Sequence, residues 1–125
     1  MGKPGNTGIK RIILATRFSA QGLSYAWQQE SAFRQEVALA VILSPFAMWL
    51  GNNPLEKTLL IVSLLLVLIV ELLNSAVEAT VDRISDKQHK LAGSAKDMGS
   101  AAVLISLVIV VIVWSTIAYN KFLLI

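Results

Sequence analysis

Three long apolar stretches dominate this sequence of 125 residues. They extend from Val37 to Leu50, from Leu55 to about Val81 and from about Met98 to Tyr119. Hydrophobic residues make up 55% of the chain, and a soluble domain of this length could not bury so much apolar surface. A lipid bilayer can cover it. Inside a bilayer the backbone must satisfy its own polar groups, so each stretch is predicted to form a helix.

The chain is therefore predicted to be an all-α membrane protein with a single domain over residues 1–125. A helix that starts near residue 30 gives the first stretch the roughly 20 residues that a bilayer requires. Ser94 and Asp97 have the spacing of a capping box, which would open the last helix there. We expect a surface helix over about 9–28, spans over about 30–50, 55–81 and 97–119, and a cytoplasmic loop over 82–96.

The segment before the first span is apolar mainly on one side. At about 100° per residue its apolar stripe contains Ile9, Ile12, Ile13, Ala20, Leu23 and Trp27. This pattern predicts an amphipathic helix on the cytoplasmic face of the membrane, with Trp27 at the interface. The apolar residues Leu14, Phe18 and Tyr25 lie on the opposite side. Either that side packs on protein, or the helix breaks near Gly22.

The distribution of Lys and Arg predicts the orientation of the spans. The segment before the first span and the predicted second loop are the basic parts of the chain, with Lys3, Lys10, Arg11, Arg17, Arg34, Arg83, Lys87, Lys90 and Lys96. The first connection contains only Lys57, and the C-terminal tail contains only Lys121. Positive charges favour the cytoplasmic side. We therefore expect the N-terminus and the second loop in the cytoplasm, and the C-terminus outside.

The second half of the middle stretch carries polar residues on one face. These residues fall within an arc of about 100° and are stacked over about 16 Å of helix: Glu71, Asn74, Ser75, Glu78 and Asp82. An ionised carboxylate in hydrocarbon is costly, so the acids should face protein, water or a metal. The simplest interpretation is a polar contact between helices. Three acids on one face favour a site for a hard cation such as Mg²⁺, which binds carboxylate and phosphate oxygens.

This polar face would extend from the water interface at Asp82 to the depth of the acyl chains at Glu71. Such a site suits a reaction between a water-soluble donor and an acceptor dissolved in the membrane. Lys96 in the first turn of the last predicted helix opposes the helix dipole, which indicates an anionic ligand. The alternative is an interfacial lysine that extends to water. Because the chain has no cysteine and only one histidine, His89, neither a thiolate site nor a His-based triad is expected.

Together these residues resemble the bacterial integral membrane diacylglycerol kinase family. The resemblance covers about Gly8 to Tyr119 and is carried by Ala26-Trp27, Glu30, Ala32-Phe33-Arg34-Gln35-Glu36, Glu71-Leu72-Leu73-Asn74-Ser75-Ala76-Val77-Glu78, Asp82-Arg83, His89 and Ala95-Lys96-Asp97-Met98-Gly99-Ser100. It implies a homotrimer of three-span subunits in the bacterial inner membrane, with sites built partly from neighbouring subunits. It also implies transfer of the γ-phosphate of MgATP to the hydroxyl of diacylglycerol, which gives phosphatidic acid.

The resemblance further implies roles for individual residues. Glu71 would be the general base on the lipid hydroxyl, and Glu30 and Glu78 would be ligands of Mg²⁺. The implied nucleotide-binding residues are Arg11, Phe18, Glu30, Asn74, Glu78, Asp82, Lys87, His89, Lys96 and Asp97. The implied lipid-substrate residues are Arg11, Ser19, Arg34, Glu36, Trp49, Glu71 and Ser100. Phe18 stands where members often have Tyr, and Lys87 departs from the acidic residue often found near the loop.

Two other functions compete with this interpretation. A kinase of the same family that phosphorylates undecaprenol would use the same chemistry, although Ser31–Glu36 and Lys96–Ser100 are closer to the diacylglycerol type. A non-enzymatic membrane subunit would carry protons or cations along the acidic face. No nucleic-acid partner is expected.

Overall fold

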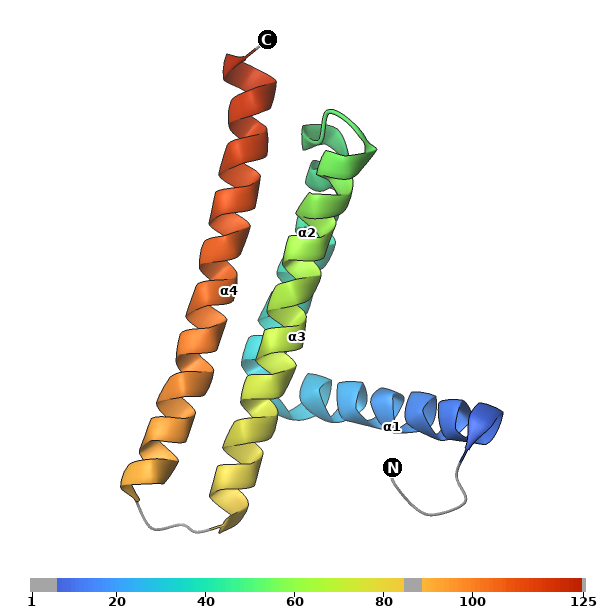
Figure 1. The fold of residues 1–125 in the computed structure, drawn as a ribbon, viewed down its shortest axis with the longest axis vertical. Helices are drawn as coiled ribbons and strands as arrows, with labels where there is room; N and C mark the ends of the chain where they lie inside the picture. Colours follow the sequence, from blue (N-terminus) through green and yellow to red (C-terminus); the bar gives the residue numbers. More distant parts are fainter. Residues whose placement is uncertain (1–6, 85–88, 125) are drawn as a thin grey trace.

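The computed structural model describes residues 7–84 and 89–124 and contains four α-helices in that part of the chain. Their bounds are α1 Gly8–Gln29, α2 Ser31–Leu50, α3 Pro54–Ile84 and α4 Lys90–Leu123 (Figure 1). Among the described residues there is no strand. Helices α2, α3 and α4 are each long and apolar enough to cross a membrane. The prediction of an all-α protein with three spans is confirmed.

The three long helices form a bundle, and α1 projects outward from its side (Figure 1). Helix α3 packs against both α2 and α4, and α1 contacts α2. The turn between α2 and α3 lies at the same end of the bundle as the C-terminus, and the connection between α3 and α4 lies at the other end (Figure 1). Helix α1 is continuous through Gly22, so the predicted alternative of a break there is wrong.

The connection between α3 and α4 is shorter than expected. The prediction of a loop over 82–96 is wrong at both ends, because α3 continues to Ile84 and α4 begins at Lys90. The predicted capping box at Ser94 and Asp97 is also wrong, since both residues lie inside α4. The helix begins earlier because His89 caps it: its Nδ1 accepts a hydrogen bond from the backbone N–H of Leu91 at 3.0 Å. Histidine is not a typical N-cap residue, so sequence patterns pointed elsewhere.

A side-chain cap closes the opposite end of the bundle, at the tight turn between α2 and α3. The Asn53 side-chain oxygen accepts from the backbone N–H of Glu56 at 2.9 Å. In return, Glu56 Oε1 accepts from the backbone N–H of Asn52, also at 2.9 Å. These reciprocal bonds satisfy the amide of Glu56 in the first turn of α3, which has no partner within the helix, and the amide of Asn52 in the turn before it. The turn and the first residues of α3 are thereby held together.

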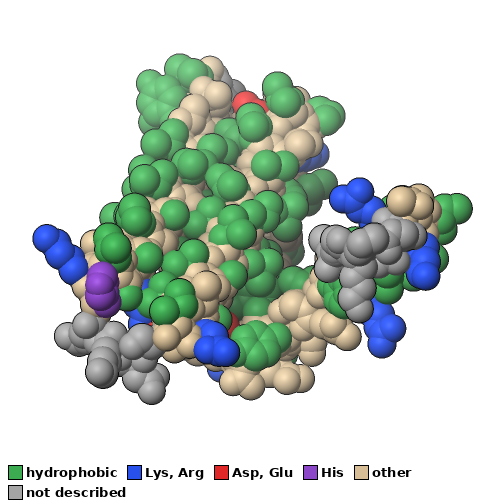
Figure 2. Space-filling model, turned by 60° about the horizontal axis from the view of Figure 1, so that its bottom comes forward, with side chains coloured by type: hydrophobic (Ala, Val, Ile, Leu, Met, Phe, Trp, Pro, Cys, Tyr) green, Lys and Arg blue, Asp and Glu red, His purple; other side chains and the backbone are tan. Residues whose placement is uncertain are grey.

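Most large apolar side chains of the bundle point outward. Val41, Ile69 and Val111 are 67%, 54% and 64% exposed, although each lies in the middle of a long helix. Figure 2 shows hydrophobic side chains over the flanks of the bundle. The small buried cluster between the helices consists of Ala47, Leu50, Leu60 and Ile117. Such an arrangement is stable where lipid, and not water, covers the outer surface.

One side-chain hydrogen bond joins α3 and α4 within the apolar part of the bundle. The indole N–H of Trp114 donates to Ser63 Oγ at 3.1 Å. The Ser63 hydroxyl in turn donates to the carbonyl of Leu60 at 2.7 Å, so it both donates and accepts. Ser63 is 3% exposed, and water cannot replace this bond. The bond therefore helps to set the axial register of α4 on α3.

A double-mutant cycle with Trp114→Phe and Ser63→Ala should give a coupling energy of about 1 kcal/mol, in the range of hydrogen bonds between membrane helices. The measurement is reversible unfolding in mixed detergent. The control cycle pairs Ser63→Ala with Thr116→Val, because the Thr116 hydroxyl donates only within its own helix, to Ile112. Coupling in the control as large as in the test pair would contradict a specific bond.

Candidate functional site

The polar face of α3 contains the one charged side chain that is buried among the described residues. Glu71 is 6% exposed, although its helix is otherwise apolar at that level. One turn closer to the end of α3, the Asn74 amide donates to Glu78 Oε1 at 3.3 Å. Asp82 follows one further turn along, where the helix side chains are exposed. The face therefore extends from a buried carboxyl to a solvent-accessible one.

Carboxylates from other parts of the chain gather near Glu71. The negative charges of Glu36, Glu78 and Glu30 all act on its carboxyl. Glu36 lies on α2, and Glu30 lies at the joint between α1 and α2, where the backbone is extended with φ −115° and ψ 103°. Four acids from three elements repel one another, and protons or cations must compensate this repulsion. The structure thus brings together the acids that the sequence distributed over 49 positions, from residue 30 to residue 78.

Helix α4 supplies a positive charge beside this acidic cluster. Lys96 Nζ lies 2.7 Å from Asp82 Oδ1, and the charge of Glu78 also acts on the ammonium group. The side chains of Lys96 and Asp82 are 44% and 64% exposed. Solvent screens a pair this exposed, so it contributes little to folding and can open at little cost. The ammonium group is accordingly available to an anionic ligand from the aqueous side.

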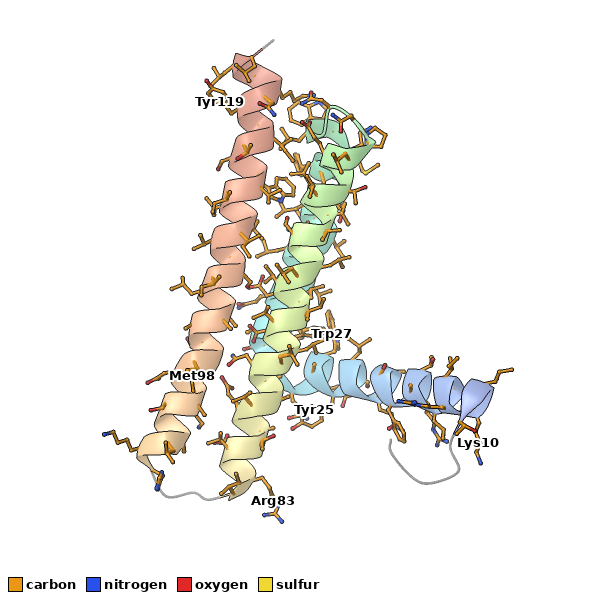
Figure 3. All side chains as sticks on the ribbon, viewed as in Figure 1. Lys10, Tyr25, Trp27, Arg83, Met98 and Tyr119 are labelled. Atoms are coloured by element: carbon orange, nitrogen blue, oxygen red, sulfur yellow. The ribbon has the colours of Figure 1, made fainter. Side chains whose placement is uncertain are left out.

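A cleft separates α1 from the same part of α3. Its volume is about 670 Å³, and it is lined by Ser19, Gly22, Leu23, Tyr25, Ala26, Glu30, Leu72, Ser75, Ala76, Ala79 and Thr80. The walls are mainly apolar, with a few hydroxyl groups and the carboxylate of Glu30. Figure 3 shows Tyr25 and Trp27 on opposite sides of α1 where the helix meets the bundle. A cleft of this kind suits an amphiphilic molecule with a small polar head.

Sequence reasoning named Ser19, Glu30 and Ser75 but missed Tyr25 and Thr80, which also line this cleft. Thr80 follows Ser75 by five positions, which is about 140° around the helix, so it lies off the acidic face and no pattern marked it. Tyr25 was noted only among the apolar residues opposite the stripe of the surface helix. Its place in the cleft depends on the angle between α1 and α3.

Several predicted site residues are exposed or lie at the other end of the bundle. Arg11 and Phe18 are exposed on α1, and Asp97 and Ser100 are exposed on α4. Trp49 lies at the opposite end of the bundle, where its carbonyl accepts from Lys121 Nζ at 3.1 Å. Lys87 falls outside the described residues.

Arg34 has a contact that sequence reasoning did not foresee. Its Nη1 donates to the carbonyls of Trp27 at 2.6 Å and Gln28 at 3.3 Å. These carbonyls belong to the last turn of α1, where they have no partners within the helix. A guanidinium group on the first turn of α2 therefore caps α1 and ties it to the bundle. The position of Glu30 between the two helices depends on this contact.

Known proteins are similar to this chain over most of its length. A family model described as prokaryotic diacylglycerol kinase matches residues 17–118. A diacylglycerol kinase from Escherichia coli (strain K12) is 49% identical over 116 residues, which cover 93% of this chain and 95% of that protein. Diacylglycerol kinases from Haemophilus influenzae and Pseudomonas aeruginosa are each 51% identical over 113 residues, or 90% of this chain and 96% and 92% of theirs.

If Arg34 holds the joint, Arg34→Met should loosen α1 relative to α2, because methionine keeps the length of the side chain but donates no hydrogen bond. The chain has no cysteine, so Ile13→Cys and Val41→Cys can be spin-labelled without background. Electron–electron distance distributions, with labelled subunits diluted in unlabelled protein, should broaden. The matched control is Arg17→Met on the exposed surface of α1, which should leave the width unchanged. Equal widths in both variants would refute the capping role.

Proposed function

The chain belongs to the family of prokaryotic diacylglycerol kinases and is a lipid kinase, and we propose that it transfers the γ-phosphate of MgATP to the free hydroxyl of 1,2-diacylglycerol. The product is phosphatidic acid. The observation that carries this proposal is the buried carboxyl of Glu71, on which the charges of Glu36, Glu78 and Glu30 act. Lys96 pairs with Asp82 at the exposed end of the same polar face.

The depth of the polar groups fits two substrates of opposite solubility. Glu71 and Asp82 are 11 residues apart on one helix, or about 16 Å along its axis. ATP would approach from water at the exposed Lys96–Asp82 end, where an ammonium group can contact phosphate oxygens. Diacylglycerol would bring its hydroxyl from the membrane to the buried end. Phosphoryl transfer depends mainly on such positioning and on charge neutralisation.

Glu71 is the residue that we assign as general base. Its carboxylate would accept the proton of the lipid hydroxyl as the alcohol oxygen bonds to the γ-phosphorus and the bond to ADP breaks. Among the described residues, Glu71 combines an acidic group with burial in the apolar part of the bundle. The glycerol head of the acceptor would occupy the cleft between α1 and α3, where Ser19, Ser75 and Thr80 supply hydroxyl groups.

Glu30 and Glu78 can supply part of the ligand set of Mg²⁺. In the part of the chain that the structure describes, no three His, Cys, Asp or Glu side chains are placed to enclose a metal ion. Mg²⁺ commonly uses only one or two carboxylates, with water and phosphate oxygens as its other ligands. Glu30 and Glu78 would hold it in this manner together with ATP. The bound ion would neutralise charge on the phosphate oxygens during transfer.

We further assign the chain to the bacterial inner membrane as a homotrimer. Lys and Arg side chains lie along α1 and at the end of the bundle that comes forward in Figure 2, which supports a cytoplasmic location of that end. Exposed Ile9, Ile12 and Ile13 support a position of α1 on the membrane surface. In the trimer, neighbouring subunits would complete each site.

Transfer of labelled γ-phosphate in mixed micelles tests the function. We expect Mg²⁺-dependent labelling of diacylglycerol, and a loss of turnover of about 100-fold or more in Glu71→Gln, with MgATP binding nearly unchanged. The control is Glu56→Gln, which alters an acid at the other end of α3 and should keep full turnover. Labelling of undecaprenol alone would change the substrate, and the absence of any labelled lipid would refute the kinase.

Mixed oligomers of two inactive variants test whether subunits share a site. If Glu30 and Glu78 of different subunits bind one metal ion, equal mixtures of Glu30→Gln and Glu78→Gln should regain about a quarter of wild-type activity, because about a quarter of the sites then combine two intact residues. A site within one subunit would regain none. The unmixed variants, taken through the same exchange of subunits, are the control.

A further inference from the structure

The contact between α3 and α4 beside the acidic cluster leaves no room for a side chain on α4. Asn74 donates through Nδ2 to Glu78 Oε1 at 3.3 Å. Its other polar atom, Oδ1, is buried and has no hydrogen-bond partner among the described residues. It points at Gly99 on α4: a Cβ at that position would overlap Oδ1 and lie 3.3 Å from Cγ. The three heavy atoms nearest to this added Cβ all belong to Asn74.

Other glycines of the helices do not face such a constraint. A Cβ on Gly93, six positions earlier in the same helix, meets nothing within 4 Å, and the same holds for Gly22 in α1. Gly99 also has no backbone reason to be glycine, because Gly8 has the one positive φ in the described chain. Glycine inside a helix lowers stability relative to alanine. Gly99 therefore carries a cost that only its contact with Asn74 explains.

We propose that Gly99 is a positioning residue for the phosphotransfer site, and this proposal rests on the function proposed above. The absence of a Cβ at position 99 lets the Asn74 carboxamide occupy the space between α3 and α4. In that place its Nδ2 reaches the carboxylate of Glu78, the proposed ligand of the metal. A hydrogen bond to a ligating carboxylate orients it and tunes its affinity for the ion. Gly99 thus acts on the metal through two other side chains.

Alanine at position 99 should break the hydrogen bond between Asn74 and Glu78. The Asn74 carboxamide must rotate away from the new methyl group, and its bond to Glu78 is then lost. Loss of such an outer hydrogen bond typically weakens metal binding about 10-fold or more. The cleft between α1 and α3 does not include Gly99, so the KM for diacylglycerol should stay unchanged.

The test is direct binding of Mn²⁺, used in place of Mg²⁺, in the presence of a non-hydrolysable ATP analogue. Electron paramagnetic resonance of free Mn²⁺ gives the Kd without any turnover. Gly99→Ala should raise this Kd about 10-fold, whereas the matched control Gly93→Ala should leave it unchanged. Kinetic assays should show the same rise in the Mg²⁺ concentration required for half-maximal activity.

A second pair of variants separates this effect from simple crowding of the helices. In an Asn74→Ala background the added methyl group meets no carboxamide, so Gly99→Ala should not raise the Kd for Mn²⁺ further. The thermal midpoint of that double variant should match or exceed that of Asn74→Ala alone. An equal loss from Gly99→Ala in both backgrounds would show that Gly99 serves helix packing and would overturn the proposal.

Measurements on the wild-type protein distinguish failure of the proposed function from failure of the role proposed for Gly99. Wild-type protein that phosphorylates no lipid and binds no Mn²⁺ with nucleotide would refute the proposed function. Wild-type protein that does both, together with a Gly99→Ala variant indistinguishable from Gly93→Ala, would refute the role of Gly99 alone.

Discussion

The absence of water inside a bilayer is the constraint on which the rest of this structure depends. Peptide groups there can bond only to one another, so the spans are continuous helices of 20, 31 and 34 residues. Apolar burial contributes little to holding these helices together, because lipid solvates leucine as well as a neighbouring helix does. Small polar contacts therefore decide how the helices align. The bond from Trp114 to Ser63 is such a contact.

The same constraint gives the acidic cluster its chemical character. A carboxylate exposed to hydrocarbon would be neutralised or driven to water, whereas Glu71 is buried between helices. Along the same face of α3, Glu78 lies closer to solvent and Asp82 is exposed to it. Lys96 pairs with Asp82 at the exposed end. A soluble phosphate donor and a membrane-dissolved alcohol can meet along this face, which passes from buried to exposed. Neither substrate has to leave the phase in which it is stable.

The joint between α1 and α2 decides what the acidic cluster can contact. A single residue, Glu30, separates the two helices, and Arg34 fixes the angle through the carbonyls at the end of α1. That angle opens the cleft between α1 and α3 and directs Glu30 toward it. Helix α1 is thus a wall of this cleft as well as a candidate membrane anchor. On the opposite side of α3, the close approach of Asn74 to Gly99 determines how the last helix meets the acids.

The sequence by itself determined the helical class, the three spans and the acidic face of α3, because these follow from hydrophobic length and from a period of 3.6 residues. Only the tertiary structure decided the start of α4 at Lys90, the cap formed by Arg34 and the fit of Gly99 against Asn74. The cap formed by Arg34 and the fit of Gly99 depend on distances between atoms of different helices, which no local pattern encodes. His89 shows the limit most clearly, since an unusual cap residue displaced a capping box that the local sequence favoured.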